Sequence, residues 1–197
     1  MSDDTGESRR RRRNPEQTRK AIIEGLLSAV HDGEFDPTTR AIADRAGVSE
    51  RSIFVHFPTR AALITASVDQ QSEQVEALIA DLDPAQPLDQ RIDAVVRQGE
   101  AIFALQRQPR VVGLIESLRT PAVDARMRLT DTRIRDALAG GFASELDRHE
   151  GEQLLDLIEA TVGWPYRHHL MDRRGLSRHA ASEAVRRALT GMLTAEW

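Results

Sequence analysis

Residues 38–63 contain two short helical patterns separated by a glycine, and no other segment of the chain constrains the fold as strongly. The first pattern covers about Thr39–Ala46 and ends at Gly47; Ser49 is a natural cap for the second, which Pro58 closes. The inward positions of both patterns are apolar, as two crossed helices that pack on each other require: Ile42, Ala43, Val48, Ile53 and Phe57.

The second short helix keeps a largely polar outward face. Its remaining positions are Ser49, Glu50, Arg51, Ser52, Val55 and His56. A short helix with such a face fits the major groove of DNA, where side chains reach the base edges. The segment therefore predicts a helix-turn-helix that binds double-stranded DNA.

The rest of the chain predicts helices and no strand. Asn14-Pro15-Glu16-Gln17 is a strong helix start, and the apolar residues that follow recur at helical spacing. Prolines and glycines separate the later patterns, at about 60–82, 88–106, 110 onward, 122–146, 151–173 and a last helix after Ser177. We expect an all-α chain of about nine helices, with a disordered basic arm at 1–13, a helix-turn-helix domain at 14–60 and a larger helical domain at 61–197.

The charge of the chain is unevenly distributed. The formal net charge is −4, yet residues 8–60 hold eleven Lys and Arg against seven Asp and Glu. Phosphate contacts depend on local positive charge, so the acidic total does not exclude a nucleic-acid partner. Cysteine is absent, and no apolar run has the length of a membrane span or the character of a signal peptide. We expect a cytoplasmic protein without a membrane segment.

The helix-turn-helix segment resembles the TetR family of transcriptional regulators. The matching residues are Thr39-Arg40, Ile42-Ala43, Ala46-Gly47-Val48-Ser49, His56-Phe57, Arg60 at the usual lysine position, and Leu63. With the preceding helix, the resemblance covers about Asn14 to Val68. Beyond Val68 it is weaker and consists of a helix containing Trp164, Gly175-Leu176-Ser177 and a final amphipathic helix.

The resemblance implies roles for individual residues. It implies phosphate contacts for Thr39 and Ser52, base-edge contacts for Arg40, Glu50 and Arg51, and backbone contacts for His56 and Arg60. The DNA-binding set also includes Ser49 and Phe54. The family usually has tyrosine where this chain has Phe54, which keeps the ring and loses the hydroxyl that reaches a phosphate.

Each of these assignments has a simpler alternative. Arg51 could be a solvated helix arginine, and Glu50 could orient Arg51 or Arg40 instead of accepting from cytosine. The five arginines from Arg9 to Arg13 could be a solubilising tail or an arm that adds salt-sensitive affinity.

The resemblance also implies a pocket for a small, mostly apolar ligand among the helices of residues 61–197. The expected pocket residues are Phe103, Ile115, Leu118, Trp164 and His168. The alternative is that these residues belong to a filled core. Pro165 is expected to kink its helix. A metal site is not expected, because adjacent histidines diverge on a helix and no third ligand stands at suitable spacing.

The final helix has a wide apolar stripe that includes Ala181, Val185, Leu189 and Leu193. It could simply cover the core of the monomer. The resemblance implies instead that the last two helices of each subunit form a four-helix homodimer interface.

These observations favour a sequence-specific DNA-binding regulator, in particular a repressor that a small-molecule effector releases from a palindromic operator. Two alternatives remain: an effector-independent DNA-binding protein, and a helical ligand-binding or interaction protein without regulatory activity. We expect neither an enzyme nor a cofactor, since the chain lacks a glycine-rich phosphate loop, a nucleophile elbow and a His-Glu-x-x-His pair.

Overall fold

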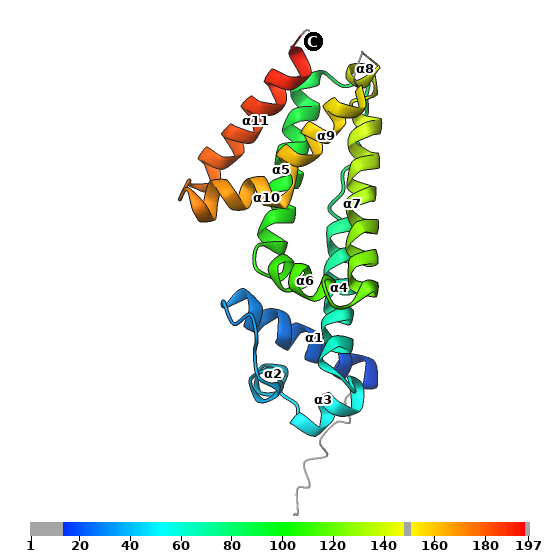
Figure 1. The fold of residues 1–197 in the computed structure, drawn as a ribbon, viewed down its shortest axis with the longest axis vertical. Helices are drawn as coiled ribbons and strands as arrows, with labels where there is room; N and C mark the ends of the chain where they lie inside the picture. Colours follow the sequence, from blue (N-terminus) through cyan, green and yellow to red (C-terminus); the bar gives the residue numbers. More distant parts are fainter. Residues whose placement is uncertain (1–13, 148–150, 196–197) are drawn as a thin grey trace, which may run out of the picture. The chain divides into compact units, whose positions relative to one another are not determined.

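The computed structural model describes residues 14–147 and 151–195, which form helices joined by loops, with no strand in this part of the chain (Figure 1). The expected all-α class is confirmed. The chain divides into two compact units, residues 1–60 and 61–197. The predicted arm at 1–13, and Trp197, lie outside the described residues. None of the described helices is both long enough and apolar enough to cross a membrane.

Eleven α-helices and one π-helical segment, η1, lie within the described residues. In the first unit they are α1 (Pro15–His31), α2 (Thr39–Ala46) and α3 (Glu50–His56). The others are α4 (Arg60–Glu76), α5 (Leu88–Gln106), α6 (Pro109–Ser117), α7 (Pro121–Gly141), α8 (Ala143–Leu146), α9 (Gly151–Val162), α10 (Trp164–His168), η1 (His169–Arg173) and α11 (Arg178–Thr194).

The number of helices exceeds the expected nine because two expected helices are interrupted. The pattern expected at 122–146 divides at Phe142 into α7 and α8. The pattern expected at 151–173 divides at Gly163, whose backbone is extended (φ −65°, ψ 161°), and Pro165 lies in the first turn of α10. Proline has no backbone N–H to continue a helix, and it is tolerated in a first turn. The kink expected at Pro165 is therefore a complete break two residues earlier.

In the first unit, α1 packs closely against α2, and the residue that permits this approach is Gly25. A Cβ atom at Gly25 would lie 2.9 Å from the carbonyl oxygen of Ile42 and 3.2 Å from the Cβ of Ala46. Any side chain at this position would push the two helices apart. An apolar core lies between the helices of this unit: Ile22, Leu26, Val30, Ile42, Ala43, Ile53 and Phe57 are buried.

The turn between α2 and α3 is fixed by local chemistry. Thr38 caps α2, its Oγ1 accepting from the N–H of Ala41 at 3.1 Å. Gly47 ends α2 in the left-handed region at φ 62°, where glycine pays no steric penalty. Ser49 caps α3, its Oγ accepting from the N–H of Ser52 at 3.2 Å. The sequence therefore determines where α3 begins and which of its sides faces the core.

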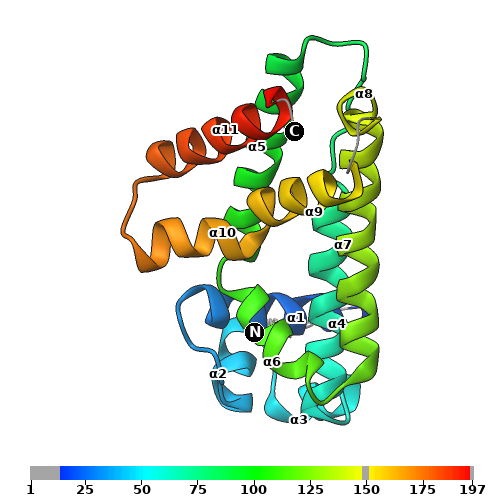
Figure 2. The same ribbon diagram turned by 45° about the horizontal axis from the view of Figure 1, so that its top comes forward.

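In the second unit, α5, α7, α9 and α11 surround one apolar core. Figure 2 shows α10 continuing from α9, with α11 returning along the same region of the bundle. The core residues are Leu82, Ile92, Val95, Val96, Leu138, Phe142, Leu154, Leu155, Ile158, Val185, Leu189 and Leu193. The apolar stripe predicted on the last helix supplies three of these residues, so at least that part of it covers the core of its own unit.

Candidate nucleic-acid interface and helical cavity

The second helix of the helix-turn-helix, α3, buries one side and exposes the other. Ile53 is buried, and so is Phe57 directly after the helix. On the opposite side, Phe54 is 59% exposed and Val55 is 70% exposed. Phe54 and Val55 are adjacent large apolar side chains on the surface, and an exposed apolar patch can mark an interaction site. This side is the candidate nucleic-acid interface.

The nine predicted DNA-binding residues lie on or near this surface. Six of them are exposed: Arg40, Ser49, Glu50, Arg51, Phe54 and Arg60. The other three, Thr39, Ser52 and His56, are half-buried. Ser49 and Ser52 also contact each other, with their Oγ atoms 3.0 Å apart. Phe54 is exposed, so its ring can pack on DNA, but phenylalanine has no hydroxyl group to donate to a phosphate.

The arginines of this unit differ in how far acidic neighbours engage them. Arg60 donates to the carbonyl oxygen of Pro37 at 2.9 Å and pairs with Asp36 at 2.6 Å. Arg45 pairs with Asp32 at 3.1 Å and Glu34 at 2.8 Å, and the hydrogen bond to Asp32 is the main cause that raises the pKa of Arg45. These contacts fasten the loop between α1 and α2.

Arg51 has no such neighbour. Within residues 14–147 and 151–195 it forms no ion pair and no side-chain hydrogen bond, and it lies in the first turn of the exposed side of α3. Arg40 is also exposed and makes only a long contact of 4.0 Å with Asp44. Exposed pairs of this kind contribute little to stability, so both guanidinium groups can change partner at small cost.

Arg19 is a residue that the sequence interpretation missed. Its Nη1 donates to the carbonyl oxygen of His56 at 3.1 Å, and its guanidinium lies 4.2 Å from the centre of the Phe57 ring. Arg19 on α1 therefore fixes the C-terminal end of α3. No local sequence pattern indicates this contact, because it joins residues 37 positions apart.

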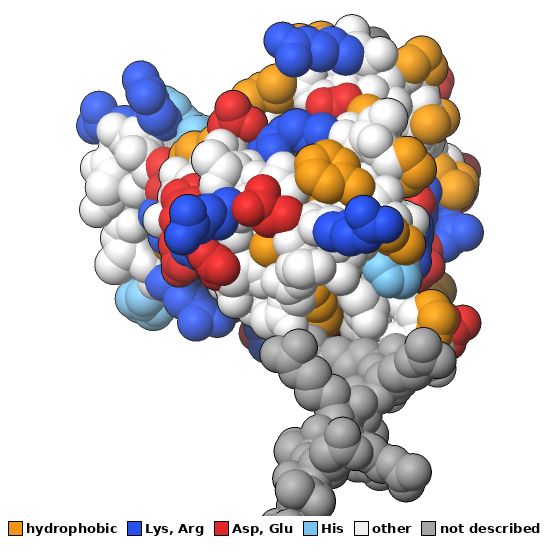
Figure 3. Space-filling view, turned by 90° about the horizontal axis from the view of Figure 1, so that it is seen from below, with side chains coloured by type: hydrophobic (Ala, Val, Ile, Leu, Met, Phe, Trp, Pro, Cys, Tyr) orange, Lys and Arg blue, Asp and Glu red, His pale blue; other side chains and the backbone are white. Residues whose placement is uncertain are grey.

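The positive charge of the N-terminal region does not come from the helix-turn-helix itself. Residues 14–60 hold six Lys and Arg and seven Asp and Glu, so the excess found over 8–60 lies in Arg9–Arg13. In the view of Figure 3, the basic side chains of the described residues are interspersed with acidic and apolar ones. Affinity of α3 for DNA would therefore depend on a few contacts and not on a broad basic surface.

The second unit contains a cavity of about 400 Å³ among α5, α6, α7, α9 and α10. Cavities of this size hold drug-sized ligands. The apolar lining consists of Val95, Gly99, Ile102, Phe103, Ile134, Ala160, Val162, Gly163, Trp164 and Pro165. The polar lining consists of Gln98, Gln106, Arg110, Asp131, Asp156 and Glu159.

Two of the five predicted pocket residues, Phe103 and Trp164, line this cavity, and three do not. Ile115 and Leu118 are 50% and 85% exposed, because α6 is short and buries only Pro109 and Gly113. They are corrected here to surface positions. His168 lies behind the wall, with its ring stacked on that of Trp164 at 4.5 Å between centroids.

The aromatic wall of the cavity is supported from behind. Phe103 and Trp164 have ring centroids 6.3 Å apart at an interplanar angle of 39°. His168 Nδ1 lies 2.9 Å from the Oδ2 of Asp172, and Arg107 Nε donates to Oδ1 of the same carboxylate at 2.9 Å. The hydrogen bond from Arg107, and then that from His168, lowers the pKa of Asp172. The carboxylate thereby stays charged and orients the imidazole ring that stacks on Trp164.

The sequence interpretation did not identify the polar residues of the cavity. Gln106 could have been found, since it follows Phe103 by one helical turn and so lies on the same side of α5. The carboxylates of α7 and α9 carried no such signal, because acidic residues on helices are usually solvated.

Comparison with known proteins agrees with this architecture. Residues 23–66 match the family described as "Bacterial regulatory proteins, tetR family". The HTH-type transcriptional repressor KstR of Mycobacterium tuberculosis is 23% identical over 162 residues, which cover 75% of this chain and 71% of that protein.

Two solved structures have the same fold. A transcriptional regulator from Rhodococcus sp. Rha1 superposes with a TM-score of 0.72 at 18% identity, covering 91% of this chain and 96% of that one. The TetR-like regulator LfrR from Mycobacterium smegmatis, solved in complex with proflavine, gives a TM-score of 0.65 at 21% identity, covering 92% and 98%. The helix-turn-helix thus carries the match to the tetR family of bacterial regulatory proteins, and the chain as a whole has the fold of these solved regulators.

Proposed function

We propose that this regulator is a repressor that binds a palindromic operator as a homodimer and leaves it when a small, mostly apolar ligand enters the cavity of residues 61–197. The observation that carries the DNA-binding part is the exposed side of α3, on which Arg51 has no partner among the described residues. The similarity to KstR, a repressor, supports the sign of regulation. The cavity and the complex of LfrR with proflavine support a small-molecule effector.

A palindromic operator follows from the size of the recognition element. One helix of seven residues reads too few bases for specificity, and a symmetric dimer doubles the reading with mirrored half-sites. The proposed dimer interface consists of the two helices expected last in the chain, at residues 151–173 and after Ser177. Footprinting near the protein's own gene, combined with sedimentation of the complex, tests both points. A monomer that binds a single asymmetric half-site tightly would contradict them.

Arg51 is the proposed base-reading residue. Arg51→Ala should lower operator affinity by about 1–3 kcal/mol and relax the preference at one base position. Arg97→Ala is a suitable control, since Arg97 is exposed on α5, outside both the helix-turn-helix and the last two helices. Selection of binding sites from a random pool measures the preference for each variant. An unchanged preference in Arg51→Ala would show that Arg51 does not read a base.

Arg60 is expected to act differently. Arg60→Ala should weaken all DNA sequences similarly and reduce the dependence on salt, as the loss of a backbone contact does. Because Arg60 also holds Asp36 and Pro37, the variant Asp36→Asn serves as the control for the loop. A weakening in Asp36→Asn equal to that in Arg60→Ala would assign the effect to the loop and not to the phosphate.

The proposed release mechanism relies on chain continuity. Only Pro58 and Thr59 separate α3 and its following Phe57 from α4, so movement of α4 is passed to α3. A change of a few ångströms in the spacing of the two recognition helices, against a groove repeat of about 34 Å, prevents both from binding. A ligand that prefers the wide-spaced state by ~100-fold supplies about 2.7 kcal/mol for this change.

The variant Trp197→Phe leaves Trp164 as the only tryptophan, so its fluorescence reports ligand entry. Ligands that change this emission should also lower operator affinity while the dimer stays intact. If the ligands that release DNA leave Trp164 emission unchanged, or split the dimer, the mechanism is wrong. If no ligand affects DNA binding, the protein is an effector-independent DNA binder.

A further inference from the structure

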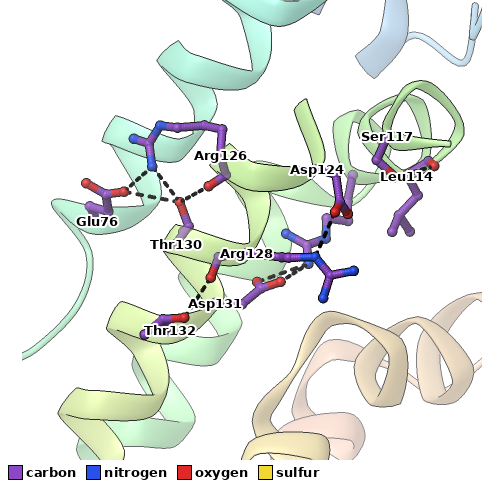
Figure 4. Close-up of polar contacts among 10 residues, drawn as sticks. Glu76, Leu114, Ser117, Asp124, Arg126, Arg128, Thr130, Asp131 and Thr132 are labelled. Atoms are coloured by element: carbon purple, nitrogen blue, oxygen red, sulfur yellow. Dashed lines mark hydrogen bonds and ion pairs between the residues drawn. The ribbon is translucent and has the colours of Figure 1, made fainter. Parts of the chain in front are cut away.

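The charged residues around the cavity are not balanced. Four charged side chains line it, and three of them are acidic: Asp131, Asp156 and Glu159 against Arg110. Arg110 pairs with Asp131, with its Nη2 at 3.0 and 2.8 Å from the two carboxylate oxygens. Asp131 and its neighbours on α7 appear in Figure 4. This pair adds no net charge to the cavity.

The other two carboxylates share a single cation. Arg135 Nη1 lies 2.7 Å from Asp156 Oδ1 and 2.5 Å from Glu159 Oε2, and Arg135 itself does not line the cavity. One guanidinium nitrogen thus faces two carboxylates. In formal charge, two carboxylates against one guanidinium leave this wall with one negative charge in excess.

A second, independent feature points to a ligand in the same cavity. Gln106 is only 8% exposed and lines the cavity, yet its amide forms no hydrogen bond with any other described residue. A buried amide without a partner costs free energy, and native proteins normally satisfy such groups. By contrast, the Oε1 of Gln98 accepts from the backbone N–H of Ala80 at 2.7 Å. The Gln106 amide is therefore available to a ligand, as is Trp164 Nε1, a buried donor of the same wall that has no hydrogen-bond partner among the described residues.

The apolar part of the wall suits a flat ring. Phe103, one turn before Gln106 on α5, and Trp164 on α10 present aromatic surfaces whose faces attract cations. Their rings are too close together to admit another ring between them, so a ligand would pack against them. An aromatic body on this wall can place polar groups near Gln106 and near the carboxylates of α9.

From the charge excess, the available amide and the aromatic wall, we infer that the cavity selects a flat aromatic cation with N–H donors over neutral or anionic molecules of the same shape. The ring packs on Phe103 and Trp164, an N–H group donates to Gln106, and the positive charge lies near Glu159. The inference specifies the ligand of the proposed repressor and rests on that proposal for its biological meaning. Binding itself can be measured without DNA.

The test compares two tricyclic probes of nearly equal size: 9-aminoacridine, which is protonated at neutral pH, and acridone, which is neutral. Equilibrium dialysis with the full-length protein should show 9-aminoacridine binding about tenfold more tightly, the scale of one screened charge interaction together with a cation–π contact. Glu159→Gln removes the excess negative charge and should remove most of this difference. Gln106→Leu should weaken 9-aminoacridine roughly fivefold, as the loss of one hydrogen bond does.

Glu183→Gln is the matched control, because Glu183 is a similarly exposed glutamate on α11 that pairs with Arg186 and does not line the cavity. It should keep the full difference between the probes. Equal binding of the two probes to the wild type, a difference that survives in Glu159→Gln, or no binding of either probe would overturn the inference.

The release of operator DNA is measured separately, and it distinguishes the two proposals. If 9-aminoacridine binds with the expected pattern and operator affinity does not change, the ligand class stands and the repressor mechanism fails. If acridone binds as tightly as 9-aminoacridine and releases the operator, the mechanism stands and the cation selectivity is overturned.

Discussion

The helical unit of residues 61–197 buries two arginines almost completely, and they differ in what compensates their charge. Arg91 on α5 forms a two-pronged pair with Glu145, with Nη1–Oε2 and Nη2–Oε1 distances of 2.8 Å, and it also donates to the carbonyl oxygens of Gln86 and Gly141. Arg167 on α10 has no carboxylate partner within residues 14–147 and 151–195. Its Nη2 donates to the carbonyl oxygen of Val96 at 2.8 Å and its Nη1 to Ser182 Oγ at 3.2 Å.

The pKa values of the two groups shift in opposite directions for this reason. The hydrogen bonds that Arg91 donates to Glu145 raise the pKa of Arg91, whereas burial lowers the pKa of Arg167 to about 10. Both guanidinium groups remain charged at neutral pH. The comparison shows that a helical bundle can hold a buried cation with neutral acceptors alone. Those acceptors do not satisfy the whole guanidinium group, because Arg167 Nε has no partner among the described residues.

The largest effect is expected when Arg91 loses its carboxylate partner and, like Arg167, keeps only neutral acceptors. Glu145→Gln keeps the shape of the side chain and leaves Arg91 with neutral acceptors only. Removing one partner of a buried ion pair costs about 3–5 kcal/mol, because the remaining charge stays desolvated. We expect a loss of this size in the free energy of unfolding, measured with urea.

The double variant Arg91→Met with Glu145→Leu is the control, since it removes both charges. It should cost clearly less than Glu145→Gln. A cost below about 1 kcal/mol for Glu145→Gln would mean that neutral acceptors satisfy Arg91 as they do Arg167, and the contrast between the two sites would disappear.

These two arginines also show how far the sequence could be interpreted. The helical patterns, the cap at Ser49 and the turn at Gly47 depend on neighbouring residues, and the structure has them where the local chemistry required. Arg91 and Arg167 look like ordinary solvated helix residues, because their partners lie 54 and 71 positions away in the chain. The same limit applies to the cavity: Phe103 and Trp164 were expected from the family resemblance, and Gln106 follows Phe103 by one turn, whereas Glu159 required the packing of α5 on α9 and α10.

Ile115 and Leu118 failed as pocket residues for a related reason. An apolar pattern predicts that a helix has a buried side, but it does not say which of several apolar positions faces a cavity. In α6 the apolar residues Val111, Leu114 and Ile115 lie together on one side, whereas the residues that the helix buries are Pro109 and Gly113, so the apolar pattern indicated the wrong side.

Gly99 should give the second largest effect. A Cβ atom at Gly99 would lie 3.3 Å from Arg167 Nε and 3.3 Å from the carbonyl oxygen of Val162. Gly99→Ala therefore crowds the buried guanidinium and should destabilise the unit by about 1–2 kcal/mol, the usual scale of overpacking. In a double-mutant cycle with Arg167→Met, the flexible methionine side chain should move aside for the added methyl group. The double variant should then lose less stability than the sum of the two single losses. Strict additivity of the two substitutions would contradict the assigned role of Gly99.

Glu76 offers the opposite case, an anion that arginines surround. Its Oε1 accepts from Arg126 Nη1 at 2.6 Å and from Thr130 Oγ1 at 3.1 Å (Figure 4), and Arg133 pairs with its other oxygen. The hydrogen bond from Arg126 is the main cause that lowers the pKa of Glu76 below 4.5. A lowered folded-state pKa adds stability above the unfolded-state pKa, and this stability is lost as the pH falls through the folded-state value.

Glu76→Gln should therefore cost about 1 kcal/mol at neutral pH and progressively less under acidic conditions, where the wild-type carboxylate takes up its proton. Thermal unfolding between neutral and acidic pH measures the two curves. Glu183→Gln, at an exposed pair on α11, should leave the pH dependence close to that of the wild type. Parallel curves for Glu76→Gln and the wild type would show that the arginines around Glu76 do not stabilise its charge.

Arg167→Met is expected to have the smallest effect on stability, although Arg167 is the more deeply buried arginine. Ser182 Oγ keeps its bond to Glu100 Oε2 at 3.0 Å, and the carbonyl oxygen of Val96 keeps its acceptor role within α5. The substitution thus leaves no new orphaned group, and it removes both a desolvated charge and the unpartnered Nε. Replacing buried charge by apolar volume is often neutral or stabilising, so the free energy of unfolding should stay within about 1 kcal/mol of the wild type. Arg91→Met is the matched comparison, because it leaves the Glu145 carboxylate buried and should cost several times more. Equal losses in the two methionine variants would mean that the hydrogen bonds of Arg167, and not the presence or absence of a counter-charge, decide the cost of removing a buried arginine from this bundle.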